Sequence, residues 1–144
     1  MKIILLITLG LSSLIWADFS RDADIVTDNK TTLQWQDDNN GTVGTGMAWE
    51  TAITHCEALT LGGYDDWRLP NFNELYYIAD RSRANPAIDP VFANRAYEYY
   101  WSSTSMVSNE SSAWVVHFGG GYSNVDVPKS TVHFVRCVRG GVTD

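Results

Sequence analysis

Hydrophobic residues recur along this chain with two spacings, one typical of a helix and one typical of strands. The helical spacing comes first, in an apolar stripe at positions i, i+3, i+4, i+7 and i+10. Its members are Trp49, Ala52, Ile53, Cys56 and Leu59. Such a stripe predicts an amphipathic helix that turns one face to a core. Leu61-Gly62-Gly63 should end this helix, because glycine readily adopts the left-handed conformation common at helix ends.

The stretch from Tyr64 to Leu75 begins with the spacing of a strand. Trp67 and Leu69 are two residues apart, so both can face one core while Arg68 points the other way. Pro70 should end this short strand, since proline lacks the N–H that a sheet requires.

A capped helix is predicted immediately afterwards. Asn71 and Glu74 form a capping-box pattern, in which each side chain bonds the other residue's backbone N–H. The apolar spacing then continues, so the helix should run from about Phe72 toward Arg81.

Arg68 lies close in sequence to Asp65, Asp66 and Glu74. Its guanidinium could be held by paired bonds to a carboxylate or to loop carbonyls. We interpret Arg68 as a structural clamp, with a ligand-binding arginine as the alternative.

Strand patterns open and close the chain. Two β-prone runs, Ile25–Thr27 and Leu33–Trp35, flank a turn-forming tripeptide and predict an opening hairpin. The later strands expected are Tyr99–Trp101, Ala113–Phe118, Tyr122–Val127 and Val132–Arg139, with a polar loop over 105–112. We therefore expect an α+β fold, in which antiparallel strands follow two helices.

The first residues have the features of a secretory signal. Lys2 supplies a positive start, Ile3–Leu11 an apolar run too short for a comfortable membrane span, and Ala17 a small residue for cleavage. The expected organisation is a signal peptide, 1–17, and one domain, 18–144, that is secreted, periplasmic or at the cell surface. No membrane insertion is expected after cleavage.

Charge excludes some partners. Loss of Lys2 leaves nine basic against 17 acidic side chains, a formal charge of −8. Nucleic acids and anionic membranes bind proteins largely through Lys and Arg, so neither is an expected partner.

The chain has two cysteines, Cys56 and Cys137. An exported protein with an even cysteine count predicts a disulfide. A cysteine nucleophile is the alternative, although Cys56 lies on an apolar helical face and Cys137 in a strand pattern.

Two patterns bear on catalysis and metals. His117 and His133 could share a face of the sheet and act with a carboxylate, although neither has a metal-ligand spacing. Residues 37–41, Asp-Asp-Asn-Asn-Gly, offer oxygen ligands for calcium but lack the spacing of an EF-hand. We expect no cofactor, with calcium as the open alternative.

Tyrosine, serine, asparagine and aspartate concentrate in the last third of the chain, which suits adaptable recognition. A twisted sheet with a merely polar face would have the same composition. Strand alternation predicts that Tyr122, Asn124 and Asp126 share one side. The candidate binding surface consists of these three residues with Trp114 beside them and Asn109 and Glu110 at the rim.

Several ordered motifs together resemble a known family. They are Trp67-Arg68-Leu69-Pro70-Asn71 with Glu74-Leu75, Tyr100-Trp101-Ser102-Ser103-Thr104, Ala113-Trp114 and the ending 135–141, after an opening Val26-Thr27-Asp28-Asn29-Lys30-Thr31. Nearly the whole mature chain thereby resembles the bacterial family named after the C-terminal domain of the Legionella collagen-like adhesin.

This resemblance implies a C-type-lectin-like fold, in which two helices flank a curled antiparallel sheet. It also implies a disulfide from the first helix to the last strand, which fits Cys56 and Cys137. The adhesin binds sulfated polysaccharide, a ligand that the charge of −8 disfavours here.

We therefore expect a secreted, non-catalytic recognition module that binds an extracellular glycan or protein in surface adhesion. The alternatives are a hypervariable-receptor-type binding protein, a hydrolase-like or oxidase-like enzyme that uses His117 and His133, and a structural subunit of a surface assembly. A pocket that holds both histidines and a carboxylate would favour the enzyme.

Overall fold

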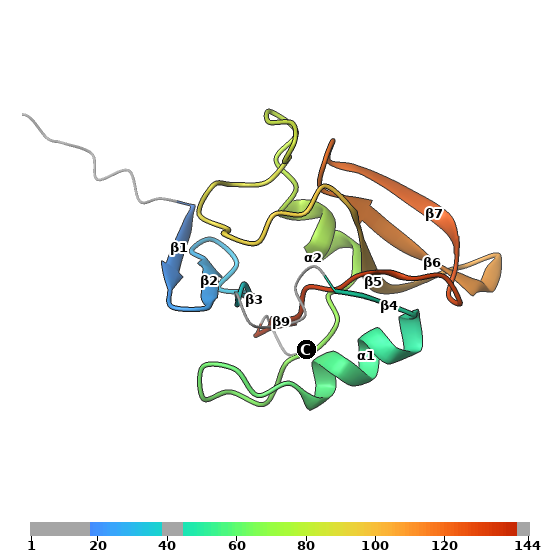
Figure 1. The fold of residues 1–144 in the computed structure, drawn as a ribbon, viewed down its shortest axis with the longest axis horizontal. Coiled ribbons are helices and arrows are strands. Elements are labelled where there is room, and N and C mark those ends of the chain that lie inside the picture. The colour runs from blue at the N-terminus through green and yellow to red at the C-terminus, as the bar shows by residue number, and fades with distance from the viewer. Residues whose placement is uncertain (1–17, 39–44, 141–144) are drawn as a thin grey trace, which may run out of the picture.

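Two helices and two sheets form the described part of the chain (Figure 1). The computed structural model describes residues 18–38 and 45–140, so the predicted signal peptide lies outside the described residues. The helices are α1 (Trp49–Ala58) and α2 (Phe72–Tyr77). The strands are β1 (Phe19–Asp22), β2 (Ile25–Asp28), β3 (Gln34–Gln36), β4 (Gly46–Met47), β5 (Tyr99–Met106), β6 (Asn109–His117), β7 (Tyr122–Pro128), β8 (His133–Phe134) and β9 (Val138–Arg139).

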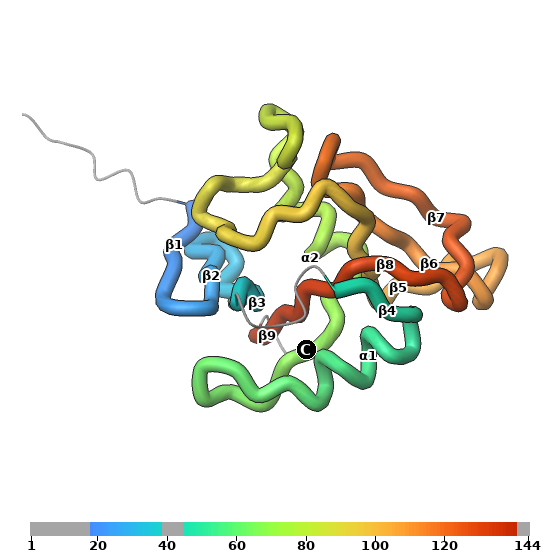
Figure 2. Tube along the Cα trace, in the orientation of Figure 1, coloured from blue at the N-terminus to red at the C-terminus, as the bar shows by residue number. Residues whose placement is uncertain are grey.

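The smaller sheet has the strand order β1-β2-β3-β9, and the larger has the order β4-β8-β5-β6-β7. Figure 2 shows β8 running beside β4, and within the sheet β8 is paired with β4 on one side and β5 on the other. Neighbouring strands are antiparallel apart from β5 and β8, which are parallel. The predicted α+β class and the opening hairpin, β2 and β3, are confirmed, while β1 was not predicted.

The larger sheet has a hydrophobic core on each face. One core packs α2 and the smaller sheet against residues such as Tyr100 and Val116. The other packs α1 against their strand neighbours, Trp101 and Val115. Trp67 and Leu69 both lie in this second core, as their spacing predicts.

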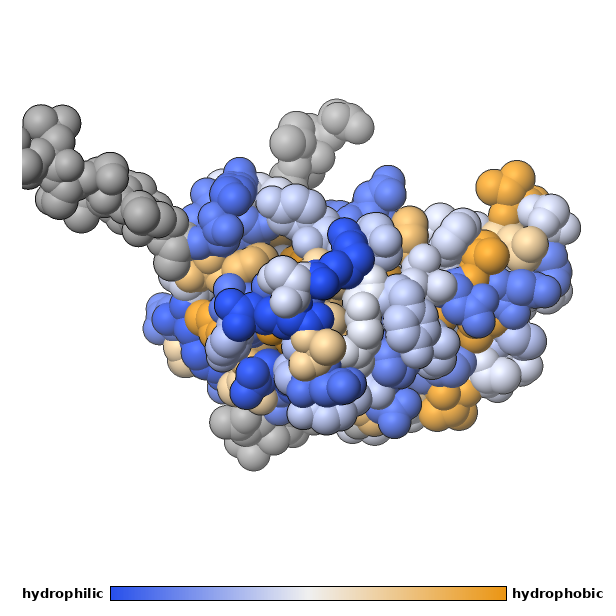
Figure 3. All heavy atoms as spheres, turned by 90° about the horizontal axis from the view of Figure 1, so that it is seen from above, coloured by the Kyte–Doolittle hydropathy of each residue, from blue (hydrophilic) through white to orange (hydrophobic). Residues whose placement is uncertain are grey.

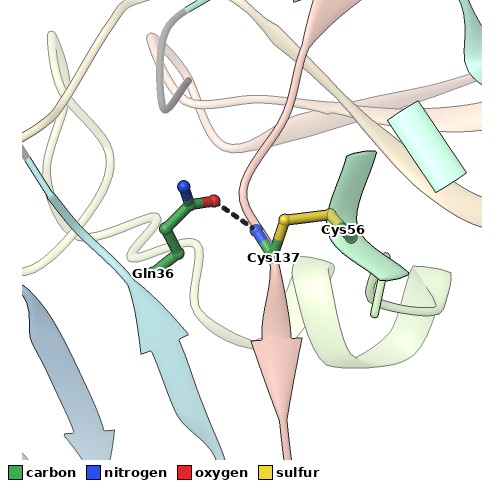
Figure 4. The surroundings of a disulfide bond; sticks show 3 residues. All are labelled: Gln36, Cys56 and Cys137. Carbon is green, nitrogen blue, oxygen red and sulfur yellow. Dashed lines mark hydrogen bonds between the residues drawn. A yellow bond between two sulfur atoms is a disulfide. The ribbon is translucent and has the colours of Figure 1, made fainter. Parts of the chain in front are cut away.

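A disulfide joins α1 to the segment that leads into β9. Cys56 of α1 is bonded to Cys137, one residue before β9, and both side chains are completely buried (Figure 4). The Cys137 amide donates a hydrogen bond to Gln36 Oε1 at 3.1 Å. The predicted pairing is therefore present, and it fastens α1 beside β3 and β9.

Helix α2 begins as predicted but ends earlier. Both bonds of the capping box between Asn71 and Glu74 are formed, each 2.9 Å long. The helix ends at Tyr77 rather than near Arg81, because the chain then turns to pair with a later segment. The Asp80 amide, for example, donates to the Ala87 carbonyl at 2.8 Å.

The polar segment 105–112 is not the predicted loop. β5 continues to Met106 and β6 begins at Asn109, so the connection is a tight hairpin turn with Val107 exposed at its tip. Ser105, Ser111 and Ser112 lie on these two strands, which pair with each other, and Ser108 lies in the turn. Polar composition thus reflects a solvent-facing strand surface rather than the absence of strands.

The predicted single strand over 132–139 is divided between the two sheets. β8 lies in the larger sheet and β9 in the smaller, and Arg136 on the connection between them is buried. The flanking Val135 and Cys137 are buried too. The alternation of apolar and polar residues cannot reveal this break, because the residues of the connection are as buried as those of a strand.

A buried ion cluster fixes this connection. The Asp37 carboxylate, which is inaccessible to solvent, pairs with Arg21 and, at 2.9 Å, with Arg136. It also accepts hydrogen bonds from the amides of Ala93 and Asn94, at 2.7 and 3.1 Å. Asp37 is therefore committed to the protein's own donors, whereas residues 39–41 of the suggested calcium loop lie outside the described residues.

Arg68 is the clamp that the sequence suggested. Its guanidinium donates two 2.7 Å hydrogen bonds to the Glu74 carboxylate and one of 3.1 Å to the Gly140 carbonyl. Burial alone would raise the pKa of Glu74, but the bonds from Arg68 and the Asn71 amide hold that pKa below its ordinary value. The pair therefore stabilises the fold above the unfolded-state pKa of Glu74, and the stabilisation is lost as pH falls through the lower folded pKa.

Replacing Arg68 by alanine should lower the melting temperature by a few degrees, equivalent to about 1 kcal/mol. The effect is limited because the Arg68 side chain is 40% exposed, so water screens the pair. The measurement is thermal unfolding followed by circular dichroism. Arg83→Ala, which breaks the more exposed pair with Asp80, is the control and should change nothing measurable. If the Arg68 variant folds and has the melting temperature of the wild type, Arg68 does not act as a structural clamp.

Candidate binding site

Four aromatic rings form a row across one face of the larger sheet. They belong to Tyr122 on β7, His117 on β6, Tyr99 on β5 and His133 on β8, and we call this row the aromatic strip. Tyr122 is 50% exposed, and the other three rings are partly buried.

Strand register assembles the strip. His117 is directly opposite Tyr99 on one side and Tyr122 on the other. Directly opposed residues project from the same face of a sheet, so these three rings meet. β8 brings Phe134 opposite Tyr100, which places the preceding residue, His133, on the face of Tyr99.

Ring contacts hold the strip together. The His117 and Tyr122 rings are nearly parallel, with centroids 4.8 Å apart. Tyr99 meets His117 edge-on at 4.7 Å and His133 edge-on at 5.8 Å. Both geometries are favourable for aromatic rings, so the strip restricts the rotamers of its own members.

The turn after β6 leaves room for two of these rings. A Cβ atom on Gly119 would lie 2.5 Å from His117 Cε1, and one on Gly120 would lie 2.8 Å from Tyr122 Cδ1. The Gly119 amide also donates to His117 Nδ1 at 3.0 Å. The glycine turn therefore packs against the rings directly, which any larger residue would disturb.

Burial changes the acidity of two members of the strip. Burial raises the pKa of the Tyr99 hydroxyl, and a hydrogen bond with Tyr122 raises it further. Burial lowers the pKa of His133, although the negative charge of Glu98 opposes this effect. The Tyr99 hydroxyl is accordingly uncharged at neutral pH. Burial of His133 likewise favours the neutral form of its imidazole.

Asn124 is exposed on β7 and lies opposite Val115, on the face that carries the strip. Its side-chain amide can both donate and accept hydrogen bonds. Of the six residues predicted to form the binding surface, Tyr122 and Asn124 are the two that belong together.

Asp126 does not share their face. The pairing of β6 with β7 shifts register between Ala113 and Val115, where β7 contains one residue more. Such a bulge reverses the side on which the following side chains project. Asp126 lies within the shift, next to Val127, and accepts a 3.0 Å hydrogen bond from the Ser112 hydroxyl. The prediction that it shares a side with Tyr122 is wrong, because simple alternation does not hold through a bulge.

Trp114 also lies on the opposite face. Its ring contacts Phe72 of α2, with centroids 4.5 Å apart, and Phe72 in turn stacks on Tyr76. Trp114 thus packs α2 onto the larger sheet, and its predicted place beside Tyr122 is wrong.

Asn109 and Glu110 are exposed but distant from Tyr122. They begin β6, whereas Tyr122 is opposite His117 at the other end of that strand. A separation of eight strand residues is roughly 25 Å, so their predicted place at the rim is also wrong. The error follows from the hairpin turn, which carries the polar segment away from the strip.

His117 and His133 do share a face, as suggested, but they are not on adjacent strands. Tyr99 lies between them, and each imidazole has its own neighbour: the Gly119 amide for His117 and, at 3.1 Å, the Thr131 hydroxyl for His133. Over residues 18–38 and 45–140, no group of three or more His, Cys, Asp or Glu side chains could hold a metal ion. The histidines thus act here as rings within a row.

Sequence reasoning missed Tyr99. The residue is visible as the first of three aromatics, Tyr99-Tyr100-Trp101, but successive members of this run face different cores. Tyr99 and His117 are nearly equidistant from the turn at 107–108, which places them opposite each other on β5 and β6. The sequence analysis predicted a loop over 105–112 in place of this hairpin, so their pairing was not expected.

Residues 24–139 match the family described as the Lcl C-terminal domain, a match that covers 116 of the 144 residues. The comparison with curated proteins found no match. No helix in the described part of the chain is long and apolar enough to cross a membrane.

Proposed function

This chain belongs to the Lcl C-terminal domain family, and from that premise we propose that it is a secreted, non-catalytic recognition module that binds an extracellular ligand in surface adhesion. The observation that carries the proposal is the aromatic strip, whose rings are preorganised and partly open to solvent. Tyrosine provides a large contact area with little loss of side-chain freedom, which is why it is frequent in recognition surfaces.

The proposal includes a scaffold and a destination. The scaffold is C-type-lectin-like, formed by residues 18–144 as one domain after cleavage of a signal peptide, 1–17. The disulfide between two buried cysteines supports an oxidising destination, either the periplasm or the cell surface. Binding requires no cofactor in this scheme, because rings and amides supply the contacts.

A structural subunit of an assembly would need a continuous apolar surface for its neighbour. The face in Figure 3 is mostly hydrophilic, and its apolar patches are small and separate. This face therefore gives no support to the structural alternative, and recognition remains the function that we propose.

The test is an array of glycans and proteins probed with residues 18–144, followed by affinity measurements on the ligands found. Changing Tyr122 and Asn124 together to alanine should weaken binding at least tenfold, because both side chains are exposed on the proposed face. The melting temperature should change little, since neither side chain is in a core.

The matched control is the double change of Glu110 and Asp126 to alanine. It also removes two exposed polar side chains, one at the far end of β6 and one on the opposite face. This control should bind like the wild type. If instead the control loses affinity and the Tyr122 and Asn124 variant keeps it, the site is not the aromatic strip.

A further inference from the structure

We propose that the aromatic strip recognises an uncharged oligosaccharide, whose sugar rings stack on Tyr122 and its neighbours. This inference rests on the recognition function proposed above and specifies the ligand class. The C–H groups of a pyranose form an apolar face that complements an aromatic ring, while its hydroxyls need directional hydrogen bonds. The strip and Asn124 offer both kinds of contact on one face.

The shape of the site favours an extended ligand. The strip crosses four adjacent strands, β7, β6, β5 and β8, so it lies across the sheet rather than along an edge. A bound peptide strand would instead pair with an edge. A shallow cavity of about 290 Å³ lies elsewhere, between Asp22, Asp24 and Tyr64, and does not include the strip. A row of rings across the sheet therefore suits a chain of sugars better than a peptide anchored in a pocket.

The charge of the site favours a neutral ligand. Anionic sugars are held by Arg or Lys, which bond sulfate and carboxylate groups. In the described residues, the cation–ring contacts involve other rings, such as Arg81 on Tyr76 and Lys129 on Trp49, and none involves the strip. Glu98, near His133, is negative, and Arg81, which reaches the Gly121 carbonyl beside Tyr122, lies over the Tyr76 ring instead. A sulfated ligand would therefore find no cation in contact with the rings of the strip.

Hydrogen-bonding groups lie beside the rings. The Asn124 amide offers two donors and one acceptor oxygen, which matches adjacent hydroxyls of a sugar. The hydroxyls of Tyr122 and Tyr99, whose rings are in contact, can take part as well. These uncharged groups can orient a sugar without an ion pair.

Gly120 keeps Tyr122 in position for stacking. An alanine Cβ there would lie 2.8 and 2.9 Å from Tyr122 Cδ1 and Cε1, so the ring would have to move. The backbone of Gly120 is not in the left-handed region that would itself strain an alanine. Gly120→Ala should thus displace the ring while the fold stays intact, which makes Gly120 a positioning residue.

The experiment probes an array of neutral, sulfated and carboxylated oligosaccharides, together with proteins, and then titrates the best neutral oligosaccharide into ¹⁵N-labelled protein. We expect neutral glycans to bind, with chemical-shift changes centred on Tyr99, His117 and Tyr122. Added salt should not weaken binding, because no ion pair is formed.

Tyr122→Ala and Gly120→Ala should each lower the affinity at least tenfold, while Gly120→Ala keeps its melting temperature. Tyr77→Ala, which removes an equally exposed tyrosine from α2, should leave the affinity unchanged. Unaltered affinity of a folded Gly120→Ala variant would overturn the positioning role.

The outcomes separate this inference from the broader function. If the protein binds only sulfated glycans, or only protein ligands, the proposal of a neutral saccharide ligand is overturned, but the proposed recognition function is kept. Absence of binding to every glycan and protein would overturn both.

Discussion

Replacing Asp37 by alanine should lower the free energy of unfolding by about 3–5 kcal/mol, the largest single-residue effect that we expect. Asp37 neutralises Arg136, whose side chain is 1% exposed, and also pairs with Arg21. Without the carboxylate, Arg136 would remain buried with no counter-charge, and two backbone amides would lose their acceptor. Chemical denaturation followed by tryptophan fluorescence measures the change.

Many domains have a total stability of about 5–15 kcal/mol, so this variant could fail to accumulate. Asp37→Asn keeps the shape and one acceptor oxygen and tests the charge alone. The control is Asp66→Asn, which removes the charge from an exposed pair with Arg139 and should leave the unfolding midpoint nearly unchanged. Equal midpoints for the Asp37 and Asp66 variants would contradict the stabilising role of the buried cluster.

Changing Cys56 and Cys137 together to alanine should lower the stability by about 4 kcal/mol, because the disulfide closes a loop of about 80 residues in the unfolded chain. The same denaturation experiment measures this loss. Loss of tight packing adds to it, since both cysteines are completely buried.

Thiol titration tests the bond itself. The mature protein, denatured without reductant, should show no free thiol and, after reduction, two. Two thiols before reduction would disprove the bond, and a double alanine variant as stable as the wild type would show that the bond contributes nothing.

Local signals predicted the elements whose structure depends on near neighbours. The helix of Trp49–Ala58 and the capping box at Asn71 follow from spacing and from two side chains three residues apart. The pairing of two buried cysteines followed from export and a resemblance. The helix and the capping box depend on residues that are close together in the sequence. The disulfide has one possible pairing, because the chain has two cysteines.

Features that depend on long-range packing could not be predicted in this way. The break between β8 and β9 is set by Arg136, whose partner, Asp37, lies 99 residues earlier. The place of Asp126 is set by a bulge that involves β6, so the sequence of β7 alone gives the wrong face. The proposed binding site therefore contains two of the residues predicted for it, Tyr122 and Asn124, because residue types suggest a recognition surface but register decides which of them meet.

The position of the disulfide has a mechanical consequence. If the module is pulled by its two ends, tension runs from the first strands through α1 to Cys56, crosses the sulfur bridge to Cys137 and leaves along β9. The segment between the cysteines carries β5 to β8, and with them every ring of the aromatic strip. That segment lies outside the covalent load path, so stretching the module would load the smaller sheet and β4 directly. The force would reach the rings only through the pairing of β4 with β8.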